Sequence, residues 1–420
     1  MTFNGLAIAP ARLLLPAAHI PHETWACVAC DQYTSQPEYW HEAARVVGDA
    51  PSCLKLVLPE CFLPETETRV PQIHGEMRRC LAEGDLVPAA EECFILVERT
   101  TQSGSRLGLV CAVDLEEYEF TGEKTLVRPT EETIAARLPA RLAVRREAPL
   151  ELSHVLLLAD DPARTVLEPL YARRDTLPLV YDFEAMQGCG HLRGWLVAGD
   201  AEMAQIADAL AALKSRLGEN PLLFAVGDGN HSLATAKAHW MAVKAGLSGE
   251  ERAHHPARFA MVEVENIHDS ALAFEPIHRI MGGVSADALL KDWADYCAAR
   301  GMTLTHEAVE GAQQVTLVSG AGEVLCAVHN PDGPIAVATL QRYLDDFLSR
   351  HPEAEIDYIH GDDVLRRLAS APGAVGFLLP PVDKSTFFAA IHTLGTLPRK
   401  TFSMGHAHEK RCYMECRAIY

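Results

Sequence analysis

Apolar residues recur every three or four positions between residues 200 and 217, which predicts an amphipathic helix there. The positions that make this pattern are Met203, Ile206, Leu210, Leu213 and Leu217. A short apolar run at 222–226 then ends in the sequence Gly-Asp-Gly-Asn-His (227–231), and helical spacing resumes at 232–245. This order predicts a buried strand, a glycine turn and a second helix.

Short apolar runs bounded by turn signals predict further strands. In the first two thirds of the chain these runs lie at 55–58, 93–97, 107–113, 155–158 and 259–264. After about residue 280 the pattern changes, and it predicts helices at 285–300, 340–350 and 362–368, a hairpin at 315–328 and a buried strand at 375–379.

Because strands and helices do not alternate strictly along the chain, we expect an α+β fold. The change of pattern places a domain boundary at 280. Residues 1–280 would form a domain with a mixed sheet, and residues 281–420 would form a smaller α/β C-terminal lobe. No internal repeat or low-complexity linker interrupts this organisation.

The composition is that of a folded and strongly acidic protein. The 420 residues are 48% hydrophobic and 22% charged, which excludes a disordered chain, a collagen-like chain and a coiled-coil rod. Lys and Arg number 37 against 57 Asp and Glu, so the formal net charge is −20, which argues against nucleic-acid binding. No apolar run approaches the ~20 residues of a membrane span. We expect a cytoplasmic protein with a small-molecule substrate and no membrane partner. A homodimer is compatible with the sequence.

Twelve cysteines are spread among apolar neighbours, a distribution typical of reduced core cysteines in a large cytosolic protein. Two pairs differ in their spacing, Cys27 with Cys30 and Cys412 with Cys416. Four sulfurs at such spacings are one arrangement that binds zinc. The flanking residues are not the turn-rich knuckles of zinc motifs, so we favour core packing and assign no metal ligand.

The glycine turn at 227–231 is the first candidate site. Its glycines let the backbone turn sharply, so that the N–H groups of the turn and of the following helix face one point, which suits an anion. The candidate phosphate-binding residues here are Gly227, Gly229, Asn230 and Ser232. Asp228 would hold a metal or orient a hydroxyl, and His231 would contact a phosphate or move a proton. No Gly-Lys-Ser/Thr follows, so this is not a Walker loop. The alternative is a tight turn in which Asp228 and Asn230 only cap the helix.

A second candidate site lies between the aromatic residues Trp25 and Trp40. Its polar residues are Asp31, Gln32, Tyr33, Thr34 and Ser35. Polar side chains crowded beside aromatic ones suit a small-molecule pocket. The alternative is a capped turn that leads into a helix at Pro37.

Basic residues are concentrated at 124–146 in an otherwise acidic chain. Arg128, Arg137 and Arg141 are candidates for binding carboxylate or phosphate, because the guanidinium fork makes paired hydrogen bonds to either group. The alternative for each is a solvated helix face.

Two further segments carry candidate residues. Glu265 and His268 directly follow the strand predicted at 259–264, where they would line a site. Lys400 belongs to a basic C-terminal run, 397–411, that would close over phosphates. The alternatives are contacts that hold two domains together and an ordinary salt-bridged terminus.

Six blocks of the sequence resemble the DUF1015 family. They are CDQYTSQPEYW, RPTEETIAARLPAR, APLELSHVLLLADD, GDGNHSLATAKAHW, HDSALAFEPIHR and LPRKTFSMGHAHEKR. The resemblance extends over nearly the whole chain, and the family's name denotes no known function.

The Gly-Asp-Gly-Asn-His block also resembles the Asp-Gly-His-His-Arg turn of ParB-like free serine kinases, a fold shared with ParB partition proteins and sulfiredoxin. This second resemblance covers only the motif, and it implies a ParB-like core whose turn binds nucleotide phosphates. Asp228, Gly229 and His231 match by position, whereas Asn230 replaces a histidine and Ser232 an arginine. The missing arginine removes one phosphate clamp, which Lys237 or a remote arginine would have to replace.

The resemblance implies a phosphotransferase that phosphorylates free L-serine, or a similar hydroxy amino acid, with ADP, ATP or pyrophosphate as donor. The turn, His231 and some of the arginines would hold the donor, and Mg²⁺ would bridge its phosphate oxygens. Asp31 or Asp228 would take the proton of the acceptor. The alternatives from other classes are a non-enzymatic nucleotide-binding ParB-like module and a zinc-dependent hydrolase.

Overall fold

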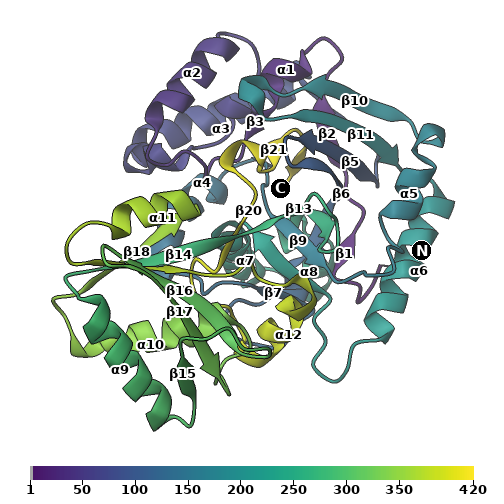
Figure 1. Ribbon diagram of the computed structural model, residues 1–420. Helices are drawn as coiled ribbons and strands as arrows, with labels where there is room; N and C mark the ends of the chain where they lie inside the picture. The colour runs from purple at the N-terminus through teal and green to yellow at the C-terminus, as the bar shows by residue number, and fades with distance from the viewer. Residues whose placement is uncertain (1–2) are drawn as a thin grey trace. The chain divides into compact units, whose positions relative to one another are not determined.

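The computed structural model describes residues 3–420 and divides into two units (Figure 1). Met1–Ala273 and Gly405–Tyr420 make up the first unit, and Phe274–Met404 make up the second. The chain is 38% helical and 28% strand in several sheets, which confirms the α+β class. The boundary expected at 280 falls inside strand β14 (Phe274–Gly282), and the last residues fold with the first unit.

The first unit contains a nine-stranded sheet within the described residues, in the order β10-β11-β5-β6-β13-β9-β12-β7, with β1 beside β6. Its strands are β1 (Ile8–Ala9), β5 (Phe94–Thr101), β6 (Gly104–Asp114), β7 (Val127–Pro129), β9 (Leu156–Ala159), β10 (Leu179–Glu184), β11 (His191–Val197), β12 (Phe224–Asp228) and β13 (Phe259–Asn266). The pairs β12–β7 and β13–β9 are parallel, and the other pairs are antiparallel. The sheet is therefore mixed, as predicted.

The C-terminal tail joins two small sheets of the same unit. β21 (Cys412–Tyr413) pairs with β3 (Cys27–Val28). β22 (Cys416–Ala418) lies between β2 (Leu13–Pro16) and β8 (Leu150–Glu151), with β4 (Leu86–Pro88) at the far edge of β2. In Figure 1 the yellow tail accordingly lies beside the purple N-terminal strands. This pairing brings residues near 410 next to residues near 30.

Eight α-helices of the first unit are described: α1 (His22–Trp25), α2 (Pro37–Val47), α3 (Thr66–Glu83), α4 (Leu138–Arg146), α5 (Glu168–Ala172), α6 (Asp200–Ser215), α7 (Asn230–Lys244) and α8 (Gly249–His254). The predictions of α6, β12 and α7 are confirmed. The strand predicted at 55–58 is wrong: the chain forms the 3-10 helix η1 (Cys53–Lys55) there, because the Ser52 hydroxyl accepts a hydrogen bond from Leu54 N and turns the backbone. A second 3-10 helix, η2 (Glu60–Glu65), follows.

The second unit has a sheet in the order β15-β17-β16-β19-β14-β18, with β20 beside β14. Its elements are α9 (Ala286–Ala299), β15 (Thr303–Thr305), β16 (Gln313–Ser319), β17 (Gly322–His329), α10 (Ala336–Arg350), β18 (Glu355–His360), α11 (Asp362–Ala369), β19 (Ala374–Leu378), α12 (Lys384–Leu394) and β20 (Phe402–Met404). The hairpin and the three predicted helices are confirmed. All described strand pairs of this unit are antiparallel, so the expected α/β lobe is α+β.

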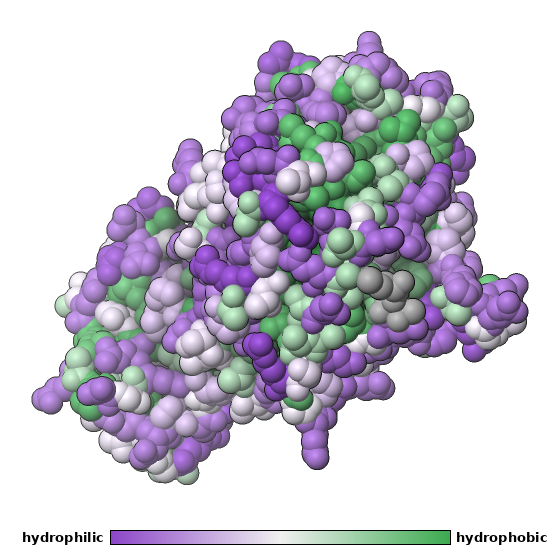
Figure 2. All heavy atoms as spheres, turned by 90° about the vertical axis from the view of Figure 1, so that its right-hand side faces the viewer, coloured by the Kyte–Doolittle hydropathy of each residue, from purple (hydrophilic) through white to green (hydrophobic). Residues whose placement is uncertain are grey.

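The two faces of strand β13 carry different kinds of residues. Ala260, Val262 and Val264 enter the apolar cluster that α6 and α7 cover. On the opposite face Glu263 and Glu265 are 4% and 1% exposed. Buried charge thus lies on the sheet face turned away from α7. The face that Figure 2 shows is mainly hydrophilic, with local apolar areas. No helix within residues 3–420 is long and apolar enough to cross a membrane.

Candidate functional site

The glycine turn joins β12 to α7 through a left-handed residue. Gly229 has φ 78° and ψ 27° and stands at the N-cap position of α7. A Cβ atom at Gly229 would lie 3.0 Å from Val155 Cα, so the position needs glycine both for its conformation and for this close approach. Gly229 N donates a hydrogen bond of 2.9 Å to Asp228 Oδ1, which fixes the carboxylate at the end of the strand.

Helix α7 begins without a side-chain cap among the described residues. Asn230 is not the cap that the alternative interpretation required, because its side chain contacts Thr130. Asn230 Oδ1 accepts from Thr130 N at 3.1 Å, and its Nδ2 donates to Thr130 Oγ1 at 3.1 Å. Thr130 Oγ1 in turn donates to Val226 O at 2.7 Å. These bonds hold the turn to β7, and the first N–H groups of a 15-residue helix stay uncapped by side chains, which suits an anion.

Asp228 faces a cation from the C-terminal tail. Lys410 Nζ lies 3.1 Å from Asp228 Oδ2, and the two side chains are only 9% and 19% exposed. Burial opposes the charge on the carboxylate, but Lys410 and His154 outweigh it and lower the pKa of Asp228. Asp228 is therefore a carboxylate held between two cations.

His154 is the centre of a buried polar chain that the sequence did not reveal. Its Nδ1 lies 2.7 Å from Tyr413 Oη, and Tyr413 Oη donates to Cys30 Sγ at 3.0 Å. Its Nε2 lies 3.2 Å from Ser232 Oγ and 3.7 Å from Asp31 Oδ2. His154 is 6% exposed.

Contacts and nearby charges together favour the doubly protonated form of the His154 imidazole. The Tyr413 hydroxyl uses its hydrogen toward Cys30, so it accepts from Nδ1, while Nε2 faces Ser232 and Asp31. Burial opposes the charge, yet Asp31, Cys30 and Asp228 raise the pKa of His154 to about 10. The site therefore holds an imidazolium at neutral pH.

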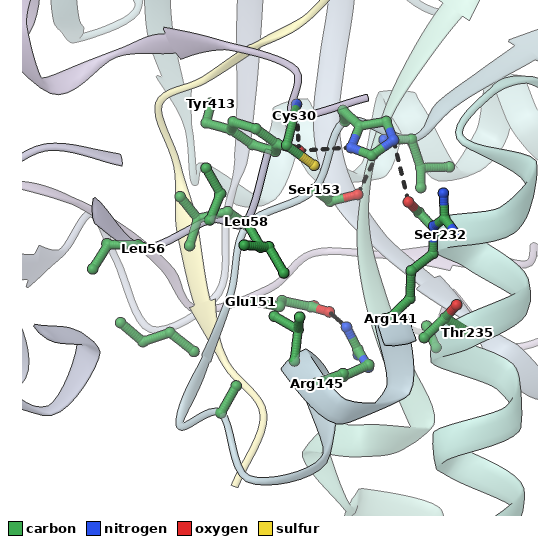
Figure 3. Close-up of a pocket in the computed structure, with 18 of the residues that line it drawn as sticks. Cys30, Leu56, Leu58, Arg141, Arg145, Glu151, Ser153, Ser232, Thr235 and Tyr413 are labelled. Atoms are coloured by element: carbon green, nitrogen blue, oxygen red, sulfur yellow. Dashed lines mark hydrogen bonds and ion pairs between the residues drawn. The ribbon is translucent and has the colours of Figure 1, made fainter. Parts of the chain in front are cut away.

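A cavity of about 140 Å³ opens beside this polar chain (Figure 3). Its polar end is formed by Cys30, Ser153, His154, Ser232 and Tyr413. From there it extends between α4, the first turns of α7 and the segment 56–63. Among the residues predicted for the site, Ser232 and Arg141 line the cavity, and Asp31 contacts it through His154.

The residues predicted around Asp31 lie in different environments and do not form one site. Gln32 Nε2 donates to Asp31 Oδ1 at 3.0 Å, so Gln32 supports the carboxylate. Tyr33 has φ 53° and stacks on Tyr39 with ring centres 3.7 Å apart. Thr34 and Ser35 are exposed.

The predicted basic residues are also scattered. Arg128 is buried and donates to Thr125 O, Pro221 O and the side chain of Asn220. Arg137 is exposed at the start of α4, Arg141 is paired with Glu60, and Lys400 belongs to the second unit. Lys237, which would have replaced the missing arginine, is buried, and its Nζ donates to Leu115 O at 2.8 Å.

Three further candidates lie next to other partners. His231 Nε2 accepts a hydrogen bond from Ile134 N at 3.3 Å. Glu265 faces Arg106 Nε at 2.9 Å, and burial raises its pKa to about 7 although Arg106 opposes the shift. His268 Nε2 lies 2.7 Å from Asp160 Oδ1. Gly227 is half-buried near the end of strand β12.

The four cysteines considered for zinc lie in the first unit with their thiols free. Cys27, Cys412 and Cys416 are buried, and burial raises the pKa of Cys27 strongly. In residues 3–420 no group of three or more His, Cys, Asp or Glu side chains is arranged to hold a metal ion.

The chain belongs to a family defined by sequence. Residues 8–347 match the family described as "Protein of unknown function (DUF1015)", which confirms the resemblance seen in the six blocks. No curated protein matches the chain.

Several solved structures show a low overall likeness. A free serine kinase in complex with AMP has a TM-score of 0.38 and 12% identity, over 73% of this chain and 90% of the kinase. A truncated SbnI from Staphylococcus aureus has a TM-score of 0.37 and 12% identity, over 70% of this chain and 83% of its own. A conserved hypothetical protein from Pyrococcus furiosus has a TM-score of 0.35 and 12% identity, with coverages of 70% and 90%. Likeness at this level does not bear on the activity of the chain.

Proposed function

We propose that this protein transfers a phosphoryl group to the hydroxyl of a small hydroxy amino acid, of which free L-serine is the simplest. The donor would be ADP, ATP or pyrophosphate. One observation carries the proposal: His154 and Ser232, the latter in the uncapped first turn of α7, line one cavity, and Asp31 lies 3.7 Å from His154. Lys410 lies beside the same turn through its ion pair with Asp228. Phosphoryl transfer needs chiefly positioning and neutralisation of charge, and these groups supply both.

The donor's terminal phosphate would bind at the start of α7, where the helix dipole and the backbone N–H groups favour negative charge. His154 lies beside Ser232 in the first turn of that helix and adds a full positive charge. Asp228 would stay paired with Lys410, because both of its neighbouring cations stabilise its ionised form. Asp228 then positions Lys410 beside the turn, and Asp31 is the better candidate for the base.

In the proposed step Asp31 accepts the proton of the acceptor hydroxyl, whose oxygen forms a bond to the terminal phosphorus of the donor. The bond from that phosphorus to the bridging oxygen breaks. The leaving group is AMP, ADP or phosphate, according to the donor. Gln32 holds Asp31 Oδ1, and His154 lies 3.7 Å from Oδ2, so the carboxylate is oriented from both sides.

A divalent cation such as Mg²⁺ would neutralise the donor's phosphate oxygens. Because the described residues offer no cluster of three metal ligands, such an ion would be held by phosphates and water with at most one protein carboxylate. This is the ordinary way in which Mg²⁺ accompanies a phosphate substrate.

The test is a transfer assay with purified protein, Mg²⁺, L-serine and each donor in turn, read by phosphorus NMR and mass spectrometry. We expect phosphoserine with at least one donor. Asp31→Asn should slow transfer by about 10²–10⁴-fold while the donor still binds, and Asp49→Asn serves as the matched control. If the donors bind and no acceptor is phosphorylated, the protein is instead the non-enzymatic nucleotide-binding module. If no donor binds, the phosphate site itself is refuted.

Four other predictions accompany this proposal without being part of its test. A ParB-like core would account for the placement of a phosphate site at the glycine turn. A small-molecule substrate, in place of nucleic acid, agrees with the net charge of −20. A cytoplasmic location and a homodimer stay predictions of the sequence.

A further inference from the structure

The cavity beside the candidate site is larger than the side chain of serine needs. Its volume is about 140 Å³. A hydroxymethyl group has only two heavy atoms, so at the polar end it would leave most of this volume unfilled. The space lies on the side away from the glycine turn, between α4 and the segment 56–63.

Most of that remaining wall is apolar. The side chains that form it are Leu56, Leu58, Leu63, Met77, Val144 and Leu150, which we call the apolar wall. Figure 3 shows Leu56 and Leu58 on this wall, separate from the polar end with Cys30 and Tyr413. Hydrocarbon placed there would gain contacts that water cannot make.

The cavity also has a cationic end, on helix α4. Arg141, Val144 and Arg145 line it at helical spacing, so one face of α4 forms this end, and Ala148 lines it just after the helix. Arg141 is paired with Glu60. Arg145 Nη1 and Arg417 Nε lie 2.6 Å from the two carboxylate oxygens of Glu151. Two guanidinium groups thus share one carboxylate, which leaves one positive charge in excess.

Two further observations agree with an excess of positive charge at this end of the cavity. Among the described residues, the buried Nε and Nη2 atoms of Arg145 have no hydrogen-bond acceptor. Nearby His239 has its pKa lowered to about 4, by burial first and then by the charge of Arg145. Buried guanidinium N–H groups without an acceptor are uncommon in proteins, and a bound anion would supply the missing acceptor.

We infer that the acceptor is a hydroxy acid whose hydroxyl and carboxylate are separated by more carbon atoms than in serine. Its hydroxyl lies at Ser232 and His154, its hydrocarbon lies against the apolar wall, and its carboxylate lies at Arg145. This inference rests on the proposed phosphoryl transfer and names the substrate class of the same cavity. Free serine would then bind more weakly than the members of that class.

Calorimetry without donor tests the inference separately from the reaction. L-serine, L-homoserine and 5-hydroxy-L-norvaline form a series with one added methylene at each step. We expect the affinity to rise about four-fold per methylene, the usual gain for a buried CH₂. 3-Amino-1-propanol, which has the hydroxyl but no carboxylate, should bind at least about ten-fold more weakly than L-homoserine. Equal or falling affinity along the series would overturn the inference.

Two variants locate the two ends of the ligand. Arg145→Gln should remove the preference for the acids over the amino alcohol, whereas Arg146→Gln, the same change on an exposed neighbour, should keep it. Ala148→Met adds bulk to the cavity wall and should remove the advantage of the longer acids while L-serine still binds. Melting curves identify a variant that has not folded, and the Ala148 variant keeps the test valid if loss of Arg145 unfolds the protein. A preference unchanged in both variants would refute the assignment.

The failure of this inference differs from that of the proposed function. Phosphoserine formed with L-serine as the best ligand would uphold the transfer reaction and reject the longer acceptor. Tight binding of the longer acids without any phosphorylated product would uphold the ligand class and reject the reaction.

Discussion

Each of the two units contains a buried histidine next to an aspartate, and the pairs carry different charges. In the first unit His154 lies 3.7 Å from Asp31 Oδ2. In the second unit His278 Nε2 lies 2.9 Å from Asp362 Oδ1. Both rings are nearly inaccessible, at 6% and 1% exposure. The pKa of His154 is raised to about 10, whereas that of His278 is lowered.

The charged groups around each ring explain the difference in pKa, since Asp31, Cys30 and Asp228 together favour the charged form of His154. His278 Nδ1 accepts a hydrogen bond from Leu379 N at 3.1 Å, so it has no proton, and the ring is neutral with its hydrogen on Nε2. Burial is the largest influence on its pKa, and Asp362, whose side chain is 57% exposed, offsets only part of it. His154 Nδ1 instead faces the oxygen of Tyr413, which accepts.

The comparison teaches that a histidine and an aspartate in contact are not by themselves a reactive pair. His278 fastens β14 to the segment after β19 and to the start of α11, which is a structural task. His154 lines a cavity, contacts the first turn of α7 and has two carboxylates within electrostatic reach. Buried charge of this kind costs folding free energy and is commonly found at functional sites.

The largest expected effect comes from removing one carboxylate from each pair. Asp31→Asn takes away the proposed base, so the rate of phosphoryl transfer should fall by about 10²–10⁴-fold. Asp362→Asn makes the same change in the second unit and should leave the rate within about two-fold, because a neutral His278 can still donate to the amide oxygen. Steady-state assays with the best acceptor measure both. Equal losses in the two variants would show that the activity does not distinguish the pairs.

The second effect is a pH dependence of stability with opposite signs in the two units. The folded-state pKa of His154 lies above its unfolded value of about 6.5. Its contribution to the unfolding free energy should therefore be complete below pH ~6.5 and disappear as the pH rises toward ~10. The folded-state pKa of His278 is lowered. Its contribution should be complete above pH ~6.5 and disappear as the pH falls below that value.

Urea unfolding of the protein and of the His154→Gln and His278→Gln variants, between pH 5 and pH 10, measures both contributions. The stability difference between the protein and the His154 variant should narrow by a few kcal/mol at high pH. For the His278 variant the difference should narrow at low pH. If both stability differences become smaller at the same end of the pH range, the two rings have the same protonation behaviour. The comparison of the two pairs would then be wrong.

The sequence predicted best the elements that depend on local pattern. The spacing from Met203 to Leu217 and the glycine turn led correctly to α6, β12 and α7. The strand predicted from the apolar run at 55–58 was wrong. Burial of Leu56, Val57 and Leu58 is compatible with a 3-10 turn as well as with a strand. The boundary at 280 missed the return of the tail to the first unit, which is a contact between distant segments.

The candidate site could be predicted only in part for the same reason. Ser232 and Asp228 belong to the turn itself, so the motif found them. Lys410 and Tyr413 reach the site because β21 pairs with β3, a pairing between residues almost 400 positions apart that no local pattern encodes. A signal for His154 was present in the sequence, since it is a polar residue two positions before the buried strand β9. Its partners, however, are set by the tertiary fold.

The smallest expected effect compares one glycine from each unit. Gly229 and Gly373 have nearly the same backbone angle, φ 78° and φ 75°. Alanine at either position should lose roughly 1–2 kcal/mol of unfolding free energy, because a Cβ atom disfavours the left-handed region. A methyl group added at Gly373 would have no other atom within 4 Å, so that cost should be its whole effect. At Gly229 the added carbon would meet Val155 Cα at 3.0 Å and His154 Cδ2 at 3.3 Å, so its loss should be larger. Urea unfolding of Gly229→Ala and Gly373→Ala measures the difference. Equal losses would mean that β9 can retreat from the turn, and the contact between Ser232 and His154 would then not be held by the backbone.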